Sequence, residues 1–359
     1  MGVFDGMLGA GESLFSNELS LDYSFIPKQI PYRENEQHHI ASCIKPLFQQ
    51  RTGRNLFLFG APGIGKTAAC RKVLQELEEQ TEDIEPVYIN CWQQNTTFKI
   101  FLAICGIIGY KFTQNKRGDE LFLIIKQMLN KKSAVFVFDE IDKTEDFDFL
   151  YSILEEVYKK TVILITNEKD CMAQIDSRVR SRLIAEQLEF RAYSPEEVKG
   201  IIKERAKYAF VNGCWEKEAL ELAAAKTYES GDIRRGLYLL RESGLAAEER
   251  ASKKITKQDV ETAMNKLDEF KTKKIDDLDS ESRFVLGIIK DNSEKKIGEL
   301  FRIYQAAGGK AVYKTFQRRI AKLEKNRFIR TEKISGGADG STSIISYSEK
   351  EGEKKLTDF

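Results

Sequence analysis

The stretch LFLFGAPGIGKT, residues 56–67, decides which fold we expect for this chain. Its apolar start is typical of a buried strand, and a helical pattern, AACRKVLQELEE, follows it directly. Between them GAPGIGKT fits G-x-x-x-x-G-K-[ST], in which backbone N–H groups and a helix N-terminus close around phosphate. The pattern therefore predicts a nucleotide-phosphate loop made of Gly60, Ala61, Pro62, Gly63, Ile64, Gly65, Lys66, Thr67 and Ala68.

Four more apolar runs follow this loop: VYIN, AVFVFDE, TVILITN and LEF. They are rich in β-branched and aromatic residues, and helical patterns separate them. Nearly continuous apolar strands that alternate with helices are typical of a parallel sheet covered on both faces. We therefore expect an α/β fold with a parallel sheet at the start of the chain.

Polar side chains follow two of these strands. Asp139 and Glu140 end AVFVFDE, and Asn167 ends TVILITN. Ligands of open α/β sheets bind at the carboxyl ends of the strands, so these side chains should lie near the phosphate loop. There Asp139 with Thr67 would hold Mg²⁺, Glu140 would deprotonate the attacking water, and Asn167 would position that water.

Two arginine clusters come later in the sequence. DSRVRSRL offers Arg178, Arg180 and Arg182, and GDIRRGLYLLR begins a helical segment with Arg234. Arginine at either place could neutralise charge on a transferring phosphoryl group. Spacing alone does not separate this role from that of a solvated helix face.

After Ser194 the strand patterns end and only helical patterns follow. SPEEVKGIIKERAKYAF has the N-cap, the proline and the early glutamates of a helix start. Helical patterns continue to about Phe270, and a charged linker follows. The last part reads as three short helices and a strand–turn–strand. We expect a nucleotide-binding α/β domain at 1–192, a helical lid at 193–272, a winged helix-turn-helix at 276–347 and a disordered tail at 348–359.

Charge is distributed unevenly along the chain. Between Arg283 and Lys333 there are fourteen Lys or Arg residues and five Asp or Glu, whereas the whole chain has a net charge of +1. In the helix expected at 310–326, Val312, Phe316, Ile320 and Leu323 form an apolar stripe. The opposite face is basic, which is typical of a helix that enters the major groove. The predicted DNA-binding residues are Lys314, Arg318, Arg319, Lys322, Lys325, Arg330 and Lys333.

Other features of the composition point to a cytoplasmic protein, which we expect to be nucleoid-associated because of the predicted DNA-binding helix. No apolar run is long enough to cross a bilayer, and the N-terminal residues do not read as a secretory signal. The six cysteines include no C-x-x-C pair, and only two histidines are present, so we expect reduced thiols and no zinc site.

Several of these motifs resemble those of AAA+ ATPases: GAPGIGKT as Walker A, FVFDE as Walker B, ITN as sensor 1 and GDIRR as sensor 2. PYRENEQ, YINC, DSRVRSRL and FRAYSPEEVKGIIKERAKYAF are similar to segments of the archaeal replication initiator family. That family is related to the largest subunit of the eukaryotic origin recognition complex and to the eukaryotic loader of the MCM helicase.

The resemblance implies roles for individual residues. Arg234 matches the sensor 2 arginine, and Arg178 matches the arginine finger best, with Arg182 second. Such a finger acts on the nucleotide of a neighbouring copy or paralogue. Tyr193 and Arg205 match lid positions that contact nucleotide, and Arg33 lies in the segment that flanks adenine.

We therefore expect an ATPase with slow, switch-type hydrolysis that binds ATP or ADP with Mg²⁺. It would bind duplex DNA at replication origins and help recruit or load the MCM helicase. Two alternatives stay open: a clamp-loader-like AAA+ ATPase, and a plasmid or viral type of DNA-binding regulator that loads no helicase.

Overall fold

The computed structural model describes residues 13–276, 278–325, 328–334 and 342–347. It divides into two compact units, residues 1–264 and 265–359, so the expected α/β domain and most of the expected lid fall in one unit. The expected tail at 348–359 and the tip of the expected hairpin lie outside the described residues.

The first unit is built on a five-stranded sheet in which every pairing is parallel. The strand order is β2-β3-β4-β1-β5, which confirms the expected parallel α/β fold. Every residue of the central strands β1, β3 and β4 is buried, because helices cover both faces of the sheet. The strands are β1 (Leu56–Phe59), β2 (Ile84–Asn90), β3 (Ser133–Asp139), β4 (Lys160–Thr166) and β5 (Glu186–Glu189).

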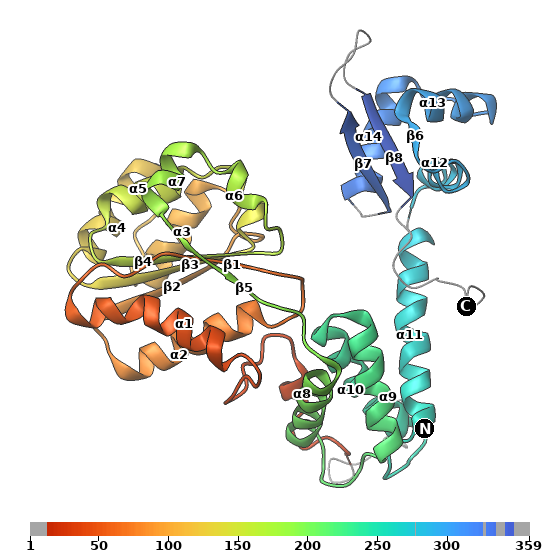
Figure 1. The fold of residues 1–359 in the computed structure, drawn as a ribbon, viewed down its shortest axis with the longest axis horizontal. Helices are drawn as coiled ribbons and strands as arrows, with labels where there is room; N and C mark the ends of the chain where they lie inside the picture. The colour runs from red at the N-terminus through yellow and green to blue at the C-terminus, as the bar shows by residue number, and fades with distance from the viewer. Residues whose placement is uncertain (1–12, 277, 326–327, 335–341, 348–359) are drawn as a thin grey trace. The chain divides into compact units, whose positions relative to one another are not determined.

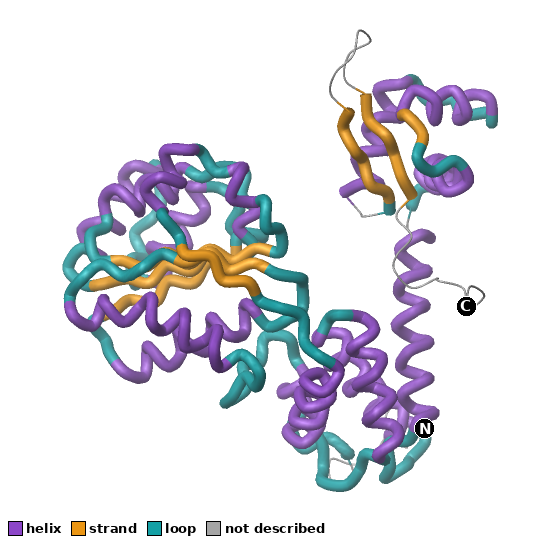
Figure 2. The backbone as a smooth tube through the Cα atoms, viewed as in Figure 1, coloured by secondary structure: helices purple, strands orange, loops and turns teal. Residues whose placement is uncertain are grey.

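Helices form a layer on each side of this sheet (Figures 1 and 2). One layer contains α1 (Glu34–Ile44) and α2 (Lys66–Gln80), with the 3-10 helix η2 (Lys45–Gln49) after α1. The other layer contains α3 (Thr97–Ile107), α4 (Gly118–Leu129), α5 (Asp148–Glu156), α6 (Cys171–Gln174) and α7 (Ser177–Leu183). A short 3-10 helix, η3 (Ile141–Lys143), directly follows β3 and lies at the carboxyl edge of the sheet.

A group of helices follows β5 and packs against the N-terminal segment. Ser194 begins α8 with a capping box, because its hydroxyl accepts the Glu197 N–H while the Glu197 carboxylate accepts the Ser194 N–H. The N-terminal segment lies along α8, where the rings of Phe15 and Phe210 are 4.6 Å apart between centroids. The elements are η1 (Glu18–Leu21), α8 (Pro195–Ala209), α9 (Lys217–Ser230), α10 (Ile233–Glu249) and α11 (Lys257–Asp276).

After the end of α11, the described part of the second unit has three helices and a three-stranded antiparallel sheet of order β6-β8-β7, the arrangement of a winged helix-turn-helix. The short strand β6, which pairs with β8, was not expected from the sequence. The elements are α12 (Ser280–Asp291), β6 (Lys295–Lys296), α13 (Ile297–Ala306), α14 (Tyr313–Lys325), β7 (Ile329–Ile334) and β8 (Thr342–Tyr347).

One residue predicted to lie in the core of this unit is exposed. Phe316, Ile320 and Leu323 are buried as predicted, but the side chain of Val312 is 67% exposed. The helix begins at Tyr313 rather than at 310, so Val312 precedes its first turn and does not continue the apolar stripe.

Two further features concern the chain as a whole. Among the residues that the structure describes, no helix is both long and apolar enough to cross a membrane. All six cysteines are buried and unpaired. Burial raises the pKa of every one of these thiols.

Phe316→Ala should lower the free energy of unfolding of the second unit by about 3–5 kcal/mol, because removing a fully buried ring leaves a cavity. Val312→Ala is the matched control and should cost less than about 0.5 kcal/mol, because Val312 is largely exposed. Hydrogen exchange of the full chain at increasing urea, followed in peptides from α12 and α14, measures both losses. Equal losses would contradict the exclusion of Val312 from the core.

Candidate functional site

The phosphate loop between β1 and α2 is tightly enclosed. Gly63 and Gly65 have φ of +75° and +91°, a region that side-chain-bearing residues rarely occupy. A Cβ at Gly63 would lie 1.9 Å from Oδ1 of Asp232, and one at Gly65 would lie 2.8 Å from the hydroxyl of Tyr193. The loop therefore requires glycine at these positions both for its conformation and for the close approach of the chain after β5.

Lys66 lies inside the loop with only 6% of its surface exposed. Its Nζ donates to the carbonyls of Gly60 and Ala61 and to Oδ1 of Asn167, each at 2.8 Å. Burial lowers the pKa of Lys66 to about 8, although the Asp139 charge opposes that shift. The ammonium is thus held at the loop by neutral acceptors, as suits a group that binds phosphate.

Asp139 ends β3 and is 3% exposed. Its Oδ2 accepts hydrogen bonds from Thr67 Oγ1 and from the Tyr88 hydroxyl, each at 2.7 Å, and its Oδ1 accepts the Glu140 N–H at 2.9 Å. The two predicted Mg²⁺ ligands, Thr67 and Asp139, therefore lie in direct contact. Hydroxyl and carboxylate oxygens are ligands that Mg²⁺ prefers, so these residues fit that ion.

Glu140 follows Asp139 in a left-handed backbone conformation, with φ of +55° and ψ of +45°. Burial raises the pKa of its carboxyl, and the charges of Asp139 and Asp142 raise it further. A carboxylate with a raised pKa is a stronger base, which agrees with the predicted role in deprotonating water. Asp142, which sequence reasoning did not single out, accepts a hydrogen bond from Thr166 Oγ1 at 2.7 Å.

The start of α10 docks directly on the phosphate loop. The Ile233 N–H donates to the Gly63 carbonyl at 3.2 Å. Beside it, the Arg234 guanidinium donates hydrogen bonds to both oxygens of the Asp232 carboxylate, with Nε 3.0 Å from Oδ1 and Nη2 2.7 Å from Oδ2. The Arg234 charge adds to the lowering of the Lys66 pKa by burial, and it partly offsets the rise in the pKa of Glu140. The structure therefore brings Arg234 to the site, as predicted for sensor 2.

Arg33 is fully buried beside the loop and braces it. Its Nε donates to the Ile64 carbonyl at 3.1 Å, and its Nη2 donates to the Arg191 carbonyl at 2.6 Å. The guanidinium carbon lies 4.0 Å from the ring centroid of Tyr193, and Nη1 is paired with Glu36 at 2.7 Å. Arg33 and Tyr193 thus both lie against the loop. The contact of Tyr193 with nucleotide, and that of the Arg33 segment with adenine, stay predictions.

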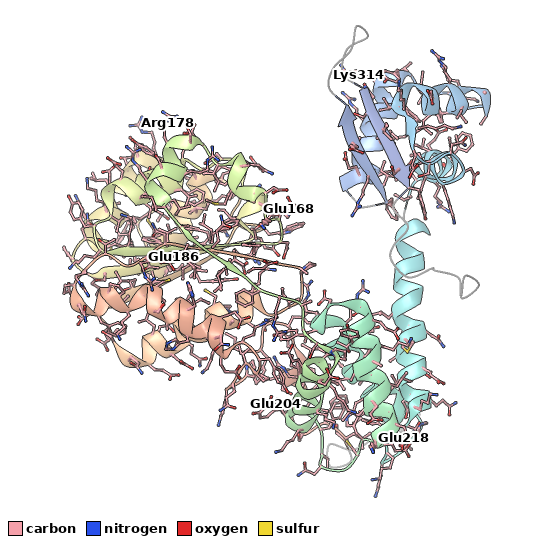
Figure 3. All side chains as sticks on the ribbon, viewed as in Figure 1. Glu168, Arg178, Glu186, Glu204, Glu218 and Lys314 are labelled. Carbon is pink, nitrogen blue, oxygen red and sulfur yellow. The ribbon has the colours of Figure 1, made fainter. Side chains whose placement is uncertain are left out.

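The other predicted arginines lie elsewhere in the first unit. Arg205 on α8 donates to the Ser20 carbonyl at 3.0 Å and lies over the ring of Phe25. Arg178 projects from the surface of α7 (Figure 3), where its side chain is 79% exposed. Arg178 pairs with Asp176 at 3.1 Å, and Arg182 pairs with Glu155 at 2.6 Å, but the side chain of Arg182 is only 37% exposed. Of the two finger candidates, Arg178 is therefore the more accessible.

In the second unit, α14 carries the predicted DNA-binding cations. Lys314 and Arg318 are exposed on this helix, and Lys314 projects outward in Figure 3. Arg330 at the start of β7 is also exposed, whereas the side chains of Lys325 and Lys333 lie outside the described residues.

Two other cations of α14 are used within this unit. Arg319 is paired with Glu281 at 3.2 Å, and Lys322 is paired with Asp279 at 3.4 Å. These two pairs connect α14 to the start of α12. The same segment is held by Tyr304, whose hydroxyl donates to the Glu281 carboxylate at 2.9 Å. Arg319 and Lys322 therefore have a structural partner that the sequence pattern did not indicate.

A separate group of potential metal ligands gathers His39, Cys43 and Glu186 where α1 meets β5. His39 Nε2 and Glu186 Oε2 are 3.0 Å apart, and Arg54 Nη1 lies 2.6 Å from Glu186 Oε1. The guanidinium already neutralises the carboxylate and would repel a second cation. We therefore interpret this group as an ion-pair network that connects α1 to β5.

Comparisons with known proteins agree with this geometry. A family model described as the Cdc6 AAA+ ATPase-type lid domain matches residues 199–265, and one described as an AAA domain matches residues 49–172. The ORC1-type DNA replication protein 1 of Sulfolobus acidocaldarius is 31% identical over 370 residues, covering 96% of this chain and 93% of that protein. The protein of the same name from Archaeoglobus fulgidus is 29% identical, covering 90% and 84%.

Solved structures of related proteins are similar to this chain over most of its length. The structure of the Aeropyrum pernix ORC1 protein in complex with DNA has a TM-score of 0.74 and 25% identity, and the match covers 93% of each chain. The structure of Cdc6p from Pyrobaculum aerophilum, at 18% identity and a TM-score of 0.65, covers 93% of this chain and 94% of that one and shares the fold.

The phosphate loop, the acidic strand end and the helical segment that docks on them define an AAA+ ATPase. Among such ATPases, this chain belongs to the family of ORC1-type DNA replication proteins.

The Asp279–Lys322 pair makes the second unit sensitive to acid. Asp279 caps α12 by accepting the Ser282 N–H at 2.9 Å, and the hydrogen bonds of Ser282, with the Lys322 charge, lower the pKa of Asp279 to about 2. The stability that Asp279 contributes is therefore complete above about pH 4 and is lost as the pH falls toward 2.

Asp279→Asn should remove the acid-sensitive part of this stability and cost about 1 kcal/mol or less at pH 7, because asparagine is itself a good N-cap but has no charge to pair with Lys322. Thermal unfolding followed through NMR signals of α12, between pH 2 and 7, measures both effects. An identical pH profile for the two proteins would contradict the role given to Asp279.

Proposed function

We propose that this protein is an ATP-dependent switch that binds duplex DNA at replication origins and helps recruit or load the MCM helicase. The observation that carries the proposal is the convergence of Lys66, Asp139 and Arg234 at one loop in a chain that also contains a winged helix-turn-helix. A relative whose structure is described as a complex with DNA supports the DNA-binding part.

In this proposal, the chain's own residues have distinct tasks. Backbone N–H groups of the loop and Lys66 bind the phosphates. Thr67 and Asp139 would hold Mg²⁺, which neutralises phosphate charge when it is bound. Glu140 deprotonates the attacking water, and Asn167, which contacts Lys66, helps to position that water.

In this proposal, the switch depends on Arg234 at the start of α10, in the helical lid. Arg234 is paired with Asp232, whose side chain lies against Gly63. A triphosphate at the loop offers Arg234 a stronger, more highly charged partner than this carboxylate. Exchange of partners would therefore couple the nucleotide state to the position of α10. Arg178 would act as the finger on a nucleotide bound by a neighbouring copy or paralogue.

Lys66→Ala should abolish ATP binding, because it removes the cation at the loop. Glu140→Gln should keep ATP affinity within about threefold and reduce hydrolysis by about a hundredfold or more, because an amide cannot act as the base. Filter binding with labelled ATP and a phosphate-release assay test the two variants. Hydrolysis by Glu140→Gln at the unmodified rate would exclude Glu140 as the base.

Replacing both Lys314 and Arg318 by alanine should weaken binding to duplex DNA and reduce the log–log salt slope by about 2, one unit for each lost phosphate contact. Arg319→Ala is the matched control, because Arg319 already pairs with Glu281. It should change the slope by less than about 0.5.

Fluorescence anisotropy of the full chain at several salt concentrations, with ATP and with ADP, measures these slopes. A larger slope change for Arg319→Ala than for the double variant would show that the interface lies on another face of α14. An affinity that is equal with the two nucleotides would contradict the switch.

A further inference from the structure

Tyr88 contacts the predicted Mg²⁺ ligand Asp139, although the proposed hydrolysis assigns it no task. It lies in β2, where it is the register partner of Val137 in β3, two residues before Asp139. Its hydroxyl donates to Oδ2 of Asp139 at 2.7 Å. Thr67 Oγ1 donates to the same oxygen, also at 2.7 Å. Two side chains from different elements therefore hold one carboxylate oxygen.

The ring of Tyr88 also contacts α2. The guanidinium carbon of Arg71 on α2 lies 5.5 Å from the ring centroid. The ring is thus fixed between α2 and the sheet, and its hydroxyl points at the acid.

The carboxylate of Asp139 needs this support because the terminal torsion of an aspartate has a broad, roughly two-fold preference. The Glu140 N–H holds Oδ1, and Thr67 and Tyr88 hold Oδ2. Thr67 has a second task, because its hydroxyl is also a predicted ligand of Mg²⁺. When that hydroxyl serves the ion, Tyr88 is the side chain that still fixes Oδ2.

We propose that Tyr88 is a positioning residue of the Mg²⁺ site, acting through Asp139 and setting how much Mg²⁺ the protein needs to bind ATP tightly. The inference rests on the proposed function, since it assumes that ATP and Mg²⁺ occupy this loop. Residues that orient metal ligands through hydrogen bonds typically contribute about 10–100-fold to metal affinity. Tyr88 therefore belongs to the metal site although it does not touch the metal.

Tyr88→Phe tests the hydroxyl alone, because phenylalanine keeps the ring between Arg71 and the sheet. Binding of a fluorescent ATP analogue to the full chain is measured in EDTA and across a Mg²⁺ titration. The Mg²⁺ concentration for half-maximal enhancement of binding should rise by about tenfold or more. Affinity in EDTA should stay within about twofold, because the loop and Lys66 are unchanged.

Two controls separate positioning from a structural effect. Tyr158→Phe removes a hydroxyl from a largely exposed tyrosine and should leave the Mg²⁺ requirement unchanged. In an Asp139→Asn background, Tyr88→Phe should raise that requirement by less than about twofold, because the two residues act in series. A thermal melt of each variant checks that the fold is retained.

Three outcomes would count against the proposal. An unchanged Mg²⁺ requirement in Tyr88→Phe would overturn it, and so would an equal loss of affinity in EDTA and in Mg²⁺, which indicates a structural role only. Both outcomes leave the proposed function standing, because the unmodified chain still binds ATP. Failure of the unmodified chain to bind ATP would instead overturn the proposed function and the role of Tyr88 with it.

Discussion

The buried carboxylate of Asp139 is the constraint on which the rest of the site depends. Removing a carboxylate from water costs several kcal/mol unless partners replace the lost hydration. Here the partners come from three places: Thr67 on α2, Tyr88 on β2 and the N–H of the next residue. The nearby Lys66 ammonium adds an opposite charge. Each partner is useful only if the sheet edge and the loop keep their positions, so satisfying one acid fixes the geometry of the whole site.

The helical segment after β5 is in direct contact with the phosphate loop. Asp232 lies where a side chain at Gly63 would be, and the first N–H of α10 donates to the loop. The loop is braced on its other side by Arg33, which is fully buried between it and the segment after β5. Changes in the loop therefore reach α10 through direct contacts rather than through a chain of intermediates.

The sequence predicted those features that arise from local pattern. Apolar runs located all five parallel strands, and GAPGIGKT located the loop, because both signals depend on neighbouring residues only. Features that depend on distant residues were not predictable. The burial of Arg33, the Tyr88–Asp139 hydrogen bond and the Arg319–Glu281 pair each join segments far apart in sequence. Val312 was misjudged because periodicity does not reveal where a helix begins.

The burial of all six cysteines has a practical consequence. Thiols react as thiolates, and a raised pKa together with burial makes each native cysteine a poor nucleophile. A single cysteine introduced on an exposed surface, for example at Tyr158 or Val312, would be the most reactive thiol in the folded chain. Dyes or spin labels could then be attached to either unit without first replacing the native cysteines, and the movement that ATP is proposed to cause could be followed in an otherwise unaltered protein.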